Sequence, residues 1–128
     1  SQAEIARFRA KIATKLVDAQ SVTLSLDTRF DVAYEALLQI RLASLRANGF
    51  KQTPVAAIMI ALQTLTTTIG YPRERIRLLD EYRRQRGLGL YDGSFDPSVI
   101  EVAAVIGEAI NLQLHFQQWI AATHPELL

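Results

Sequence analysis

Apolar residues recur every three or four positions through most of the chain, which is the spacing of one face of an α-helix. In the first such segment, residues 4–19, the apolar stripe contains Ile5, Phe8, Ile12 and Leu16. We find no convincing strand and no internal repeat. The hydrophobic pattern therefore predicts an all-α protein.

A second helix is predicted to begin near Asp27, because an aspartate there can accept hydrogen bonds from the free N–H groups of the first turn. It is predicted to end at Asn48 and Gly49, since glycine adopts the left-handed conformation without a Cβ clash. Its inward face is expected to consist of Phe30, Ala33, Tyr34, Leu37, Leu38, Leu42 and Leu45.

A third helix is predicted at residues 54–69. Thr53 is its expected cap, and Pro54 occupies the first position, where a missing N–H costs nothing. The segment is apolar on nearly all sides and is followed by Gly70. We therefore expect it to be the most deeply buried helix.

A fourth helix is predicted to begin at Pro72, to bury Ile76 and Leu79, and to end at Gly87 and Gly89. It is rich in arginine. Six of the 14 basic residues of the chain lie between positions 73 and 86, and no Lys or Arg follows. The net charge is nevertheless only +1, so charge is unevenly distributed along the chain.

Arg83, Arg84 and Arg86 are expected to form a positive helix end beside a glycine-containing turn. Arginine pairs well with phosphate oxygens, so this end is a candidate site for a phosphate or another anion. A solvent-exposed, salt-bridged helix face is the alternative interpretation, because acidic residues are interleaved with these arginines.

The last helix is predicted to begin with Asp96 as its cap and Pro97 in its first position, and to end near Thr123 before Pro125. Short connections between such helices favour a single domain, residues 1–128, folded as an up-and-down bundle of four or five helices. The expected stripe of this last helix is Val99, Val102, Ala103, Ile106, Ile110, Leu114 and Trp119.

Leu112, Phe116 and Trp119 add apolar surface to this helix beyond a single stripe. A helix of this kind is buried on two sides, either within its own chain or against a second subunit. We therefore predict a homodimer with Leu112, Phe116 and Trp119 in its interface.

Composition excludes several kinds of chemistry. The chain has no cysteine, so thiolate zinc sites and cysteine nucleophiles are excluded, and a cytoplasmic location is compatible with this absence. His115 and His124 are too widely spaced for an H-E-x-x-H metal motif, and no P-loop or G-x-S-x-G motif occurs. We expect no metal, no cofactor, no secretory signal and no membrane span, and we expect a cytoplasmic protein.

Two segments resemble a known family. One is Asp31-Val-Ala-Tyr34-Glu-Ala36 with Leu45 and Asn48-Gly49-Phe50 after it, and the other, residues 79–91, reads L-x-x-Y-R-R-x-R-x-x-x-x-Y. Both are similar to HEPN domains, the "higher eukaryote and prokaryote nucleotide-binding" helical bundles. Residues 96–119 resemble the final helix of that family, and short stand-alone bacterial members are the nearest branch.

The resemblance implies a four- or five-helix bundle, commonly a symmetric dimer. Active family members are metal-independent ribonucleases, in which an arginine and a following histidine promote attack of the RNA 2′-hydroxyl on the adjacent phosphorus. Other members partner small nucleotidyltransferases in toxin–antitoxin pairs. Still others bind nucleotides or serve as scaffolds.

Arg86 matches the signature arginine of the family, Gly87 replaces its usual polar residue, and Tyr91 stands at its histidine position. The ordinary pKa of tyrosine is about 10 and that of histidine is about 6.5. A tyrosine at position 91 is therefore a poor proton carrier at neutral pH, although it can hold a phosphate. His115 would take over proton transfer only if it faced the same cleft.

These residues predict a protein that binds a nucleotide or an RNA phosphate, or docks a partner protein, with weak or no catalysis. One alternative is an active ribonuclease toxin, with Arg86 and Tyr91 as its catalytic pair. The other is a purely structural interaction module.

Overall fold

The all-α prediction is confirmed. A computed structural model describes residues 1–49, 64–91 and 93–128, with the backbone alone at positions 90 and 91. Within these ranges it contains no strand. The elements are α1 (Gln2–Ala19), α2 (Leu26–Ala47), α4 (Thr64–Ile69), α5 (Arg73–Tyr91), α6 (Val99–Thr123) and a short 3-10 helix, η1 (Pro125–Leu127).

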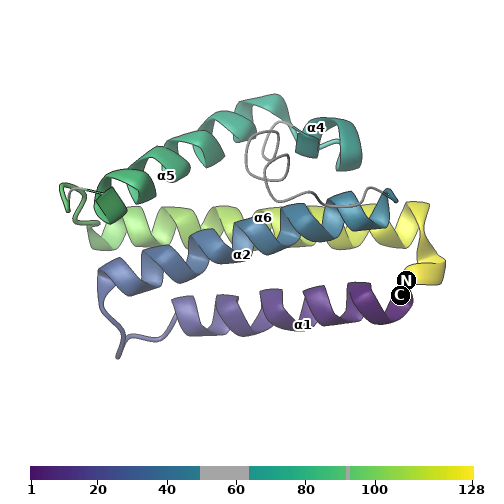
Figure 1. Ribbon diagram of the computed structural model, residues 1–128, viewed down its shortest axis with the longest axis horizontal. Coiled ribbons are helices and arrows are strands. Elements are labelled where there is room, and N and C mark those ends of the chain that lie inside the picture. The colour runs from purple at the N-terminus through teal and green to yellow at the C-terminus, as the bar shows by residue number, and fades with distance from the viewer. Residues whose placement is uncertain (50–63, 92) are drawn as a thin grey trace.

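The helices α1, α2 and α6 lie alongside one another, and α5 lies on the other side of α2 and α6 from α1 (Figure 1). The two chain ends meet, since Gln2 Nε2 donates a hydrogen bond to the Leu128 carbonyl at 2.6 Å. The predicted third helix falls largely on residues outside the described part. Its last turn is α4, and it ends at Gly70 with φ +70°, as predicted.

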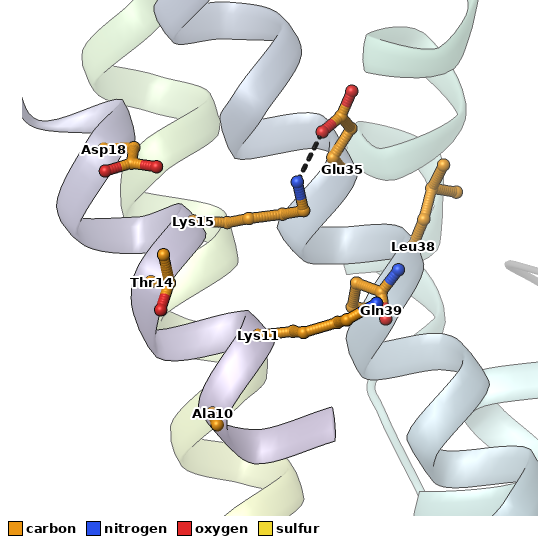
Figure 2. Close-up of a pocket in the computed structure, with 8 residues that line it drawn as sticks. All are labelled: Ala10, Lys11, Thr14, Lys15, Asp18, Glu35, Leu38 and Gln39. Carbon is orange, nitrogen blue, oxygen red and sulfur yellow. Dashed lines mark hydrogen bonds and ion pairs between the residues drawn. The ribbon is translucent and has the colours of Figure 1, made fainter. Parts of the chain in front are cut away.

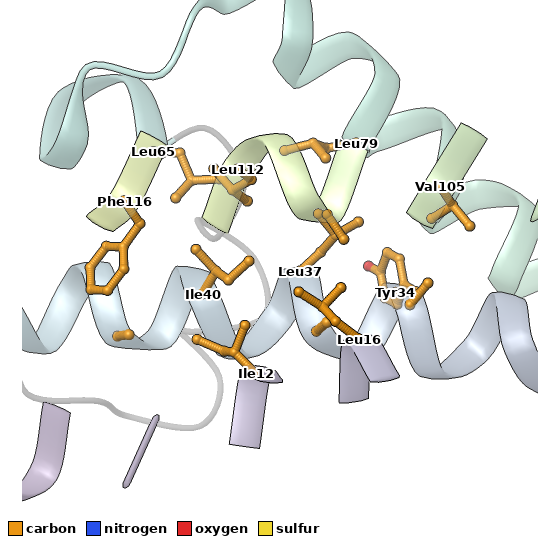
Figure 3. Packing of buried hydrophobic residues seen from close by; sticks show 14 of the residues in the cluster. Ile12, Leu16, Tyr34, Leu37, Ile40, Leu65, Leu79, Val105, Leu112 and Phe116 are labelled. Atoms are coloured by element: carbon orange, nitrogen blue, oxygen red, sulfur yellow. The ribbon is translucent and has the colours of Figure 1, made fainter. Parts of the chain in front are cut away.

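A single hydrophobic core joins these helices (Figure 3). Each contributes at least one fully buried side chain. The predicted stripe of the last helix is wrong in part, because Val99, Ala103 and Leu114 are exposed. Prominent members are Ile12 and Leu16 of α1, Leu37 and Ile40 of α2, Leu65 of α4, Leu79 of α5, and Val105, Leu112 and Phe116 of α6. This core fixes α5 across α2, and it thereby places the arginine-rich helix over the second helix of the chain.

Serine side chains cap three helices, and two predicted caps are wrong. Ser25, not Asp27, accepts a hydrogen bond from the first turn of α2. Ser98, not Asp96, caps α6, where Ser98 and Glu101 each accept a hydrogen bond from the other's backbone N–H. This reciprocal capping box satisfies two N–H groups at once, which a lone aspartate does not achieve.

The predicted end of the fourth helix at Gly87 and Gly89 is also wrong, because α5 continues to Tyr91. A glycine inside a helix is unfavourable by about 1 kcal/mol relative to alanine, which weakens a helix without ending it. The positive φ in this region belongs to Gly93, at +68°. Arg86 therefore lies inside a helix and not at its end.

Leu112 and Phe116 are 0% and 1% exposed and belong to the core of their own chain. Their predicted place in a dimer interface is therefore wrong, because neither presents a surface to a second subunit. Trp119 is partly buried and stacks on Phe116 with ring centroids 6.4 Å apart. By length and composition α6 would also be able to cross a membrane, a property shared by core helices of soluble proteins.

Candidate phosphate-binding site

The arginine that matches the HEPN signature lies against the other segment that carries the resemblance. The guanidinium carbon of Arg86, on α5, is 5.2 Å from the centre of the Tyr34 ring on α2. Its Nε lies 3.6 Å from Asp31 Oδ1, and its Nη2 lies 3.9 Å from Glu35 Oε1. Two stretches some fifty residues apart in the sequence thus meet at one guanidinium group.

Both carboxylates attract Arg86 without forming a hydrogen bond to these two nitrogens. An N–H···O hydrogen bond spans about 2.7–3.2 Å, which is shorter than either distance. The Nε of Arg86 is buried and has no acceptor, while the side chain as a whole is 25% exposed. The guanidinium is therefore oriented by charge, and an external anion can reach only the exposed part of the side chain, because Nε itself is inaccessible.

The Tyr34 ring lies beneath the Arg86 guanidinium and is almost fully buried. Burial raises the pKa of Tyr34 above its ordinary value, against the opposing effect of Arg86 and Arg41. Its hydroxyl is thus a neutral group at physiological pH. Burial also raises the pKa of Asp31, while Arg86 acts to lower it.

Glu35 connects this site to α1. Lys15 Nζ donates a hydrogen bond to Glu35 Oε2 at 2.7 Å, across an open groove of about 470 Å³ between α1 and α2 (Figure 2). Lys11 and Gln39 line the same groove (Figure 2). Lys15 offsets the charge of Glu35, so the surroundings of Arg86 are less acidic than its two neighbouring carboxylates suggest.

The other two predicted phosphate-binding residues interact with acids of their own helix. Arg83 Nη2 lies 3.0 Å from Asp80 Oδ1, and Arg84 Nη2 lies 2.8 Å from Glu81 Oε2. Both arginine side chains are more than half exposed. This is the salt-bridged arrangement that the sequence left as an alternative, and it leaves Arg86 as the guanidinium with the distinct environment.

The described residues do not contain the whole predicted Arg86–Tyr91 pair, because the Tyr91 side chain lies outside them. His115 does not face Arg86. Its Nε2 lies 2.7 Å from the carbonyl oxygen of Ile69, and its ring packs edge-on against Tyr71. The condition under which His115 would supply proton transfer is therefore not met.

A second polar cluster, not predicted from the sequence, ties the start of α5 to α6. Glu108 is 4% exposed, accepts a short hydrogen bond from the Tyr71 hydroxyl, and receives Arg75 Nη1 at 2.9 Å. Asn111 Nδ2 donates to the Tyr71 hydroxyl oxygen at 3.0 Å. The sequence did contain a signal for this cluster, because the spacing of Glu108, Asn111 and His115 places them on one helix face within an otherwise apolar segment.

The described part of the chain contains no group of three or more His, Asp or Glu side chains placed to hold a metal ion. The fold and the Arg86 site define the molecule as an all-α helical bundle with an arginine held between two helices. Comparison with known protein families, with curated proteins and with solved structures finds no match to this chain.

Proposed function

We propose that this protein is a HEPN-like helical bundle that binds a phosphate group, of a nucleotide or of RNA, through Arg86, with weak or no catalysis. One observation carries the proposal. Arg86 is oriented by Asp31 and Glu35 above the Tyr34 ring, while its side chain remains 25% exposed.

The chemistry of this arrangement suits a phosphate. A guanidinium presents its donors as a planar fork that matches two oxygens of a phosphate group. The ring of Tyr34 and the carboxylate of Asp31 restrict the fork to one orientation, which reduces the entropy lost on binding. The ligand would approach at the exposed edge of Arg86, where Lys15 offsets the repulsion from Glu35.

Weak catalysis follows from the groups beside Arg86. General acid–base catalysis is most efficient when the pKa of the catalytic group lies near the working pH. In the described part of the chain, two carboxylates and Tyr34 lie beside Arg86. Burial raises the pKa of Tyr34 further above neutral pH, so Tyr34 is poorly suited to proton transfer. Purified protein incubated with single-stranded RNA and EDTA is expected to leave the RNA intact, and cleavage abolished by Arg86→Ala would instead support the ribonuclease alternative.

Binding can be tested by fluorescence anisotropy with labelled adenosine 5′-monophosphate and a labelled single-stranded RNA decamer. Arg86→Gln is expected to weaken binding at least about tenfold, because a charge-assisted hydrogen bond contributes about 1.5–3 kcal/mol. Arg84→Gln is the matched control, since Arg84 lies on the same helix in a local ion pair. Equal affinity of wild type and Arg86→Gln would contradict the proposal.

We also propose that two copies pair through the exposed face of α6, which supports the interaction-module alternative as well. Val99, Ile100 and Leu114 on this helix are 67%, 80% and 51% exposed. Gly107, also exposed, permits close helix approach, and no charged side chain interrupts this face. Leu114→Glu is expected to shift a dimer to monomer in analytical ultracentrifugation, and Leu88→Glu, at a similarly exposed leucine on α5, is expected not to.

A further inference from the structure

An open pocket of about 390 Å³ lies between α4 and the first turns of α5, which are neighbours in the fold (Figure 1). In the described part of the chain its lining consists of Thr66, Thr67, Arg73, Ile76 and Arg77. No carboxylate is among these residues, and both arginines are exposed. The pocket therefore joins two guanidinium groups that a ligand can reach from solvent.

Arg73 and Arg77 differ from the other arginines of α5. Each of the four at positions 75, 83, 84 and 86 has a guanidinium nitrogen within 3.6 Å of a carboxylate oxygen. Within residues 1–49, 64–91 and 93–128, Arg73 and Arg77 have no such partner. Glu81, one turn after Arg77, pairs with Arg84, and Glu74 does not line the pocket. The two unpaired arginines of the helix thus line one pocket.

The positions of these two arginines are unfavourable for the helix that carries them. Arg73 is the first residue of α5, where the partial positive charge of the helix N-terminus repels a cation. Arg77 follows one turn later, and like charges spaced i,i+4 on a helix repel each other. Helix stability therefore does not explain the pair, whereas an anion held between the two guanidinium groups would offset both repulsions.

The number and type of these groups favour a phosphate monoester. One guanidinium fork already satisfies both oxygens of a carboxylate, whereas a phosphate monoester offers three oxygens and carries a charge of about −1.5 to −2 at neutral pH. Two guanidinium groups match that charge and that number of oxygens.

The threonines of the pocket can only accept further hydrogen bonds. Thr66 Oγ1 donates to the Tyr71 carbonyl at 2.9 Å, and Thr67 Oγ1 donates to a carbonyl of its own helix at 3.0 Å. A hydroxyl that has used its single proton still accepts through its lone pairs. The pocket thus offers donors to an anion at one side and acceptors to ligand hydroxyl groups at the other.

We propose that this pocket binds the phosphate monoester of a small hydroxylated molecule, the chemistry shared by a sugar phosphate and a nucleoside monophosphate. Arg73 and Arg77 hold the phosphate group, the threonine oxygens accept hydrogen bonds from the ligand, and Ile76 provides an apolar wall. The site is separate from Arg86, which follows Arg73 by 13 residues, or about 20 Å of helix. It does not depend on phosphate binding by Arg86.

Isothermal titration calorimetry of the full chain tests the ligand class, with ribose 5-phosphate, orthophosphate and dimethyl phosphate as probes. Ribose 5-phosphate is expected to bind most tightly, and dimethyl phosphate most weakly, because a diester has one charge and two free oxygens. The order is expected to be the same in Arg86→Gln, which separates this site from the Arg86 site. Tighter binding of adenosine 5′-monophosphate would identify the nucleoside monophosphate as the preferred source. Equal affinity for the three probes, or binding that Arg86→Gln abolishes, would overturn the inference.

Two substitutions test the arginines without endangering the fold. Arg73→Gln and Arg77→Gln are each expected to weaken ribose 5-phosphate binding at least about tenfold, because each removes charge-assisted hydrogen bonds. Arg84→Gln, in a local ion pair on the same helix, is the matched control and is expected to bind like the wild type. Without ligand, Arg77→Gln is expected to unfold at or slightly above the wild-type midpoint, since a like-charge repulsion is removed. Wild-type affinity in both variants would overturn the inference.

Thr67→Val tests the acceptor side of the pocket. Valine keeps the shape of the threonine side chain and removes its oxygen, and Thr67 is exposed, so the fold is expected to tolerate the change. The variant is expected to bind ribose 5-phosphate several-fold more weakly and orthophosphate with unchanged affinity. If ribose 5-phosphate binds the variant as it binds the wild type, the ligand does not need a hydroxyl donor, and the sugar phosphate assignment is overturned.

Discussion

The buried carboxylate of Glu108 provides the sharpest test of how α5 is attached. Replacement by alanine leaves the Tyr71 hydroxyl, in a residue only 1% exposed, without its acceptor. An unsatisfied buried donor is unfavourable by about 1–3 kcal/mol, and the lost methylene adds about 0.8 kcal/mol. Arg75 is 45% exposed and can return to water, so its ion pair adds at most about 1 kcal/mol.

These contributions sum to a loss of roughly 2–5 kcal/mol in the free energy of unfolding of Glu108→Ala, measured by urea denaturation. For a chain of this size the thermal midpoint should fall by about 10 °C. Glu81→Ala, in an exposed ion pair on α5, is the control and is expected to change stability by less than about 0.5 kcal/mol. A Glu108→Ala protein as stable as the control would refute the reasoning. It would show that the desolvation cost of the Glu108 carboxylate cancels the stabilisation from its hydrogen bond and ion pair.

Three further results are expected. Ser98→Ala should lower the unfolding free energy by about 1 kcal/mol in urea, because the α6 cap is lost. Gly87→Ala should raise it by about 0.4–1 kcal/mol, since Gly87 is helical and a Cβ there meets nothing within 4 Å; a loss would mean that α5 ends earlier than described. Burial and the Glu108 hydrogen bond raise the pKa of Tyr71 above 10, so the stability linked to its protonated form is present below about pH 10 and is lost as pH rises further. A pH titration of unfolding should show this alkaline loss reduced in Tyr71→Phe, and an unchanged profile would contradict the linkage.

Hydrophobic spacing was sufficient to predict the class of the fold and most helix boundaries. Ile5, Ile12 and Leu16 are buried as the stripe required, and Gly49 ends the α2 region with positive φ. Caps were predicted less well, because Asp and Ser are comparable caps and the choice depends on a partner three residues later. Ser98 caps α6 instead of Asp96, because Ser98 and Glu101 exchange hydrogen bonds.

The locations of the interface and site residues were harder to predict, because they depend on tertiary contacts that no local sequence pattern contains. Periodicity marks Leu112 and Phe116 as buried, but it does not tell whether their own chain or a second one covers them. The environment of Arg86 likewise depends on α5 continuing past Gly87 and crossing α2. Arg41, on α2, is 6% exposed. Its burial had no signal in the sequence, because a single arginine on an amphipathic helix is ordinarily exposed.

The shallow attachment of α5 to the other helices affects its local dynamics. Among its described side chains Leu79 alone is fully buried. Its other attachments include the Arg75–Glu108 pair, the Tyr82 ring against Phe30, the Gln85–Glu101 hydrogen bond and the Arg86 contacts with α2. Because α5 has one fully buried side chain and its other contacts are only partly buried, we expect it to open as its own cooperative unit without unfolding the α1, α2 and α6 bundle. Amide protons of α5 should therefore exchange with deuterium well before those of α2, and a ligand that bridges α2 and α5 should slow that exchange selectively.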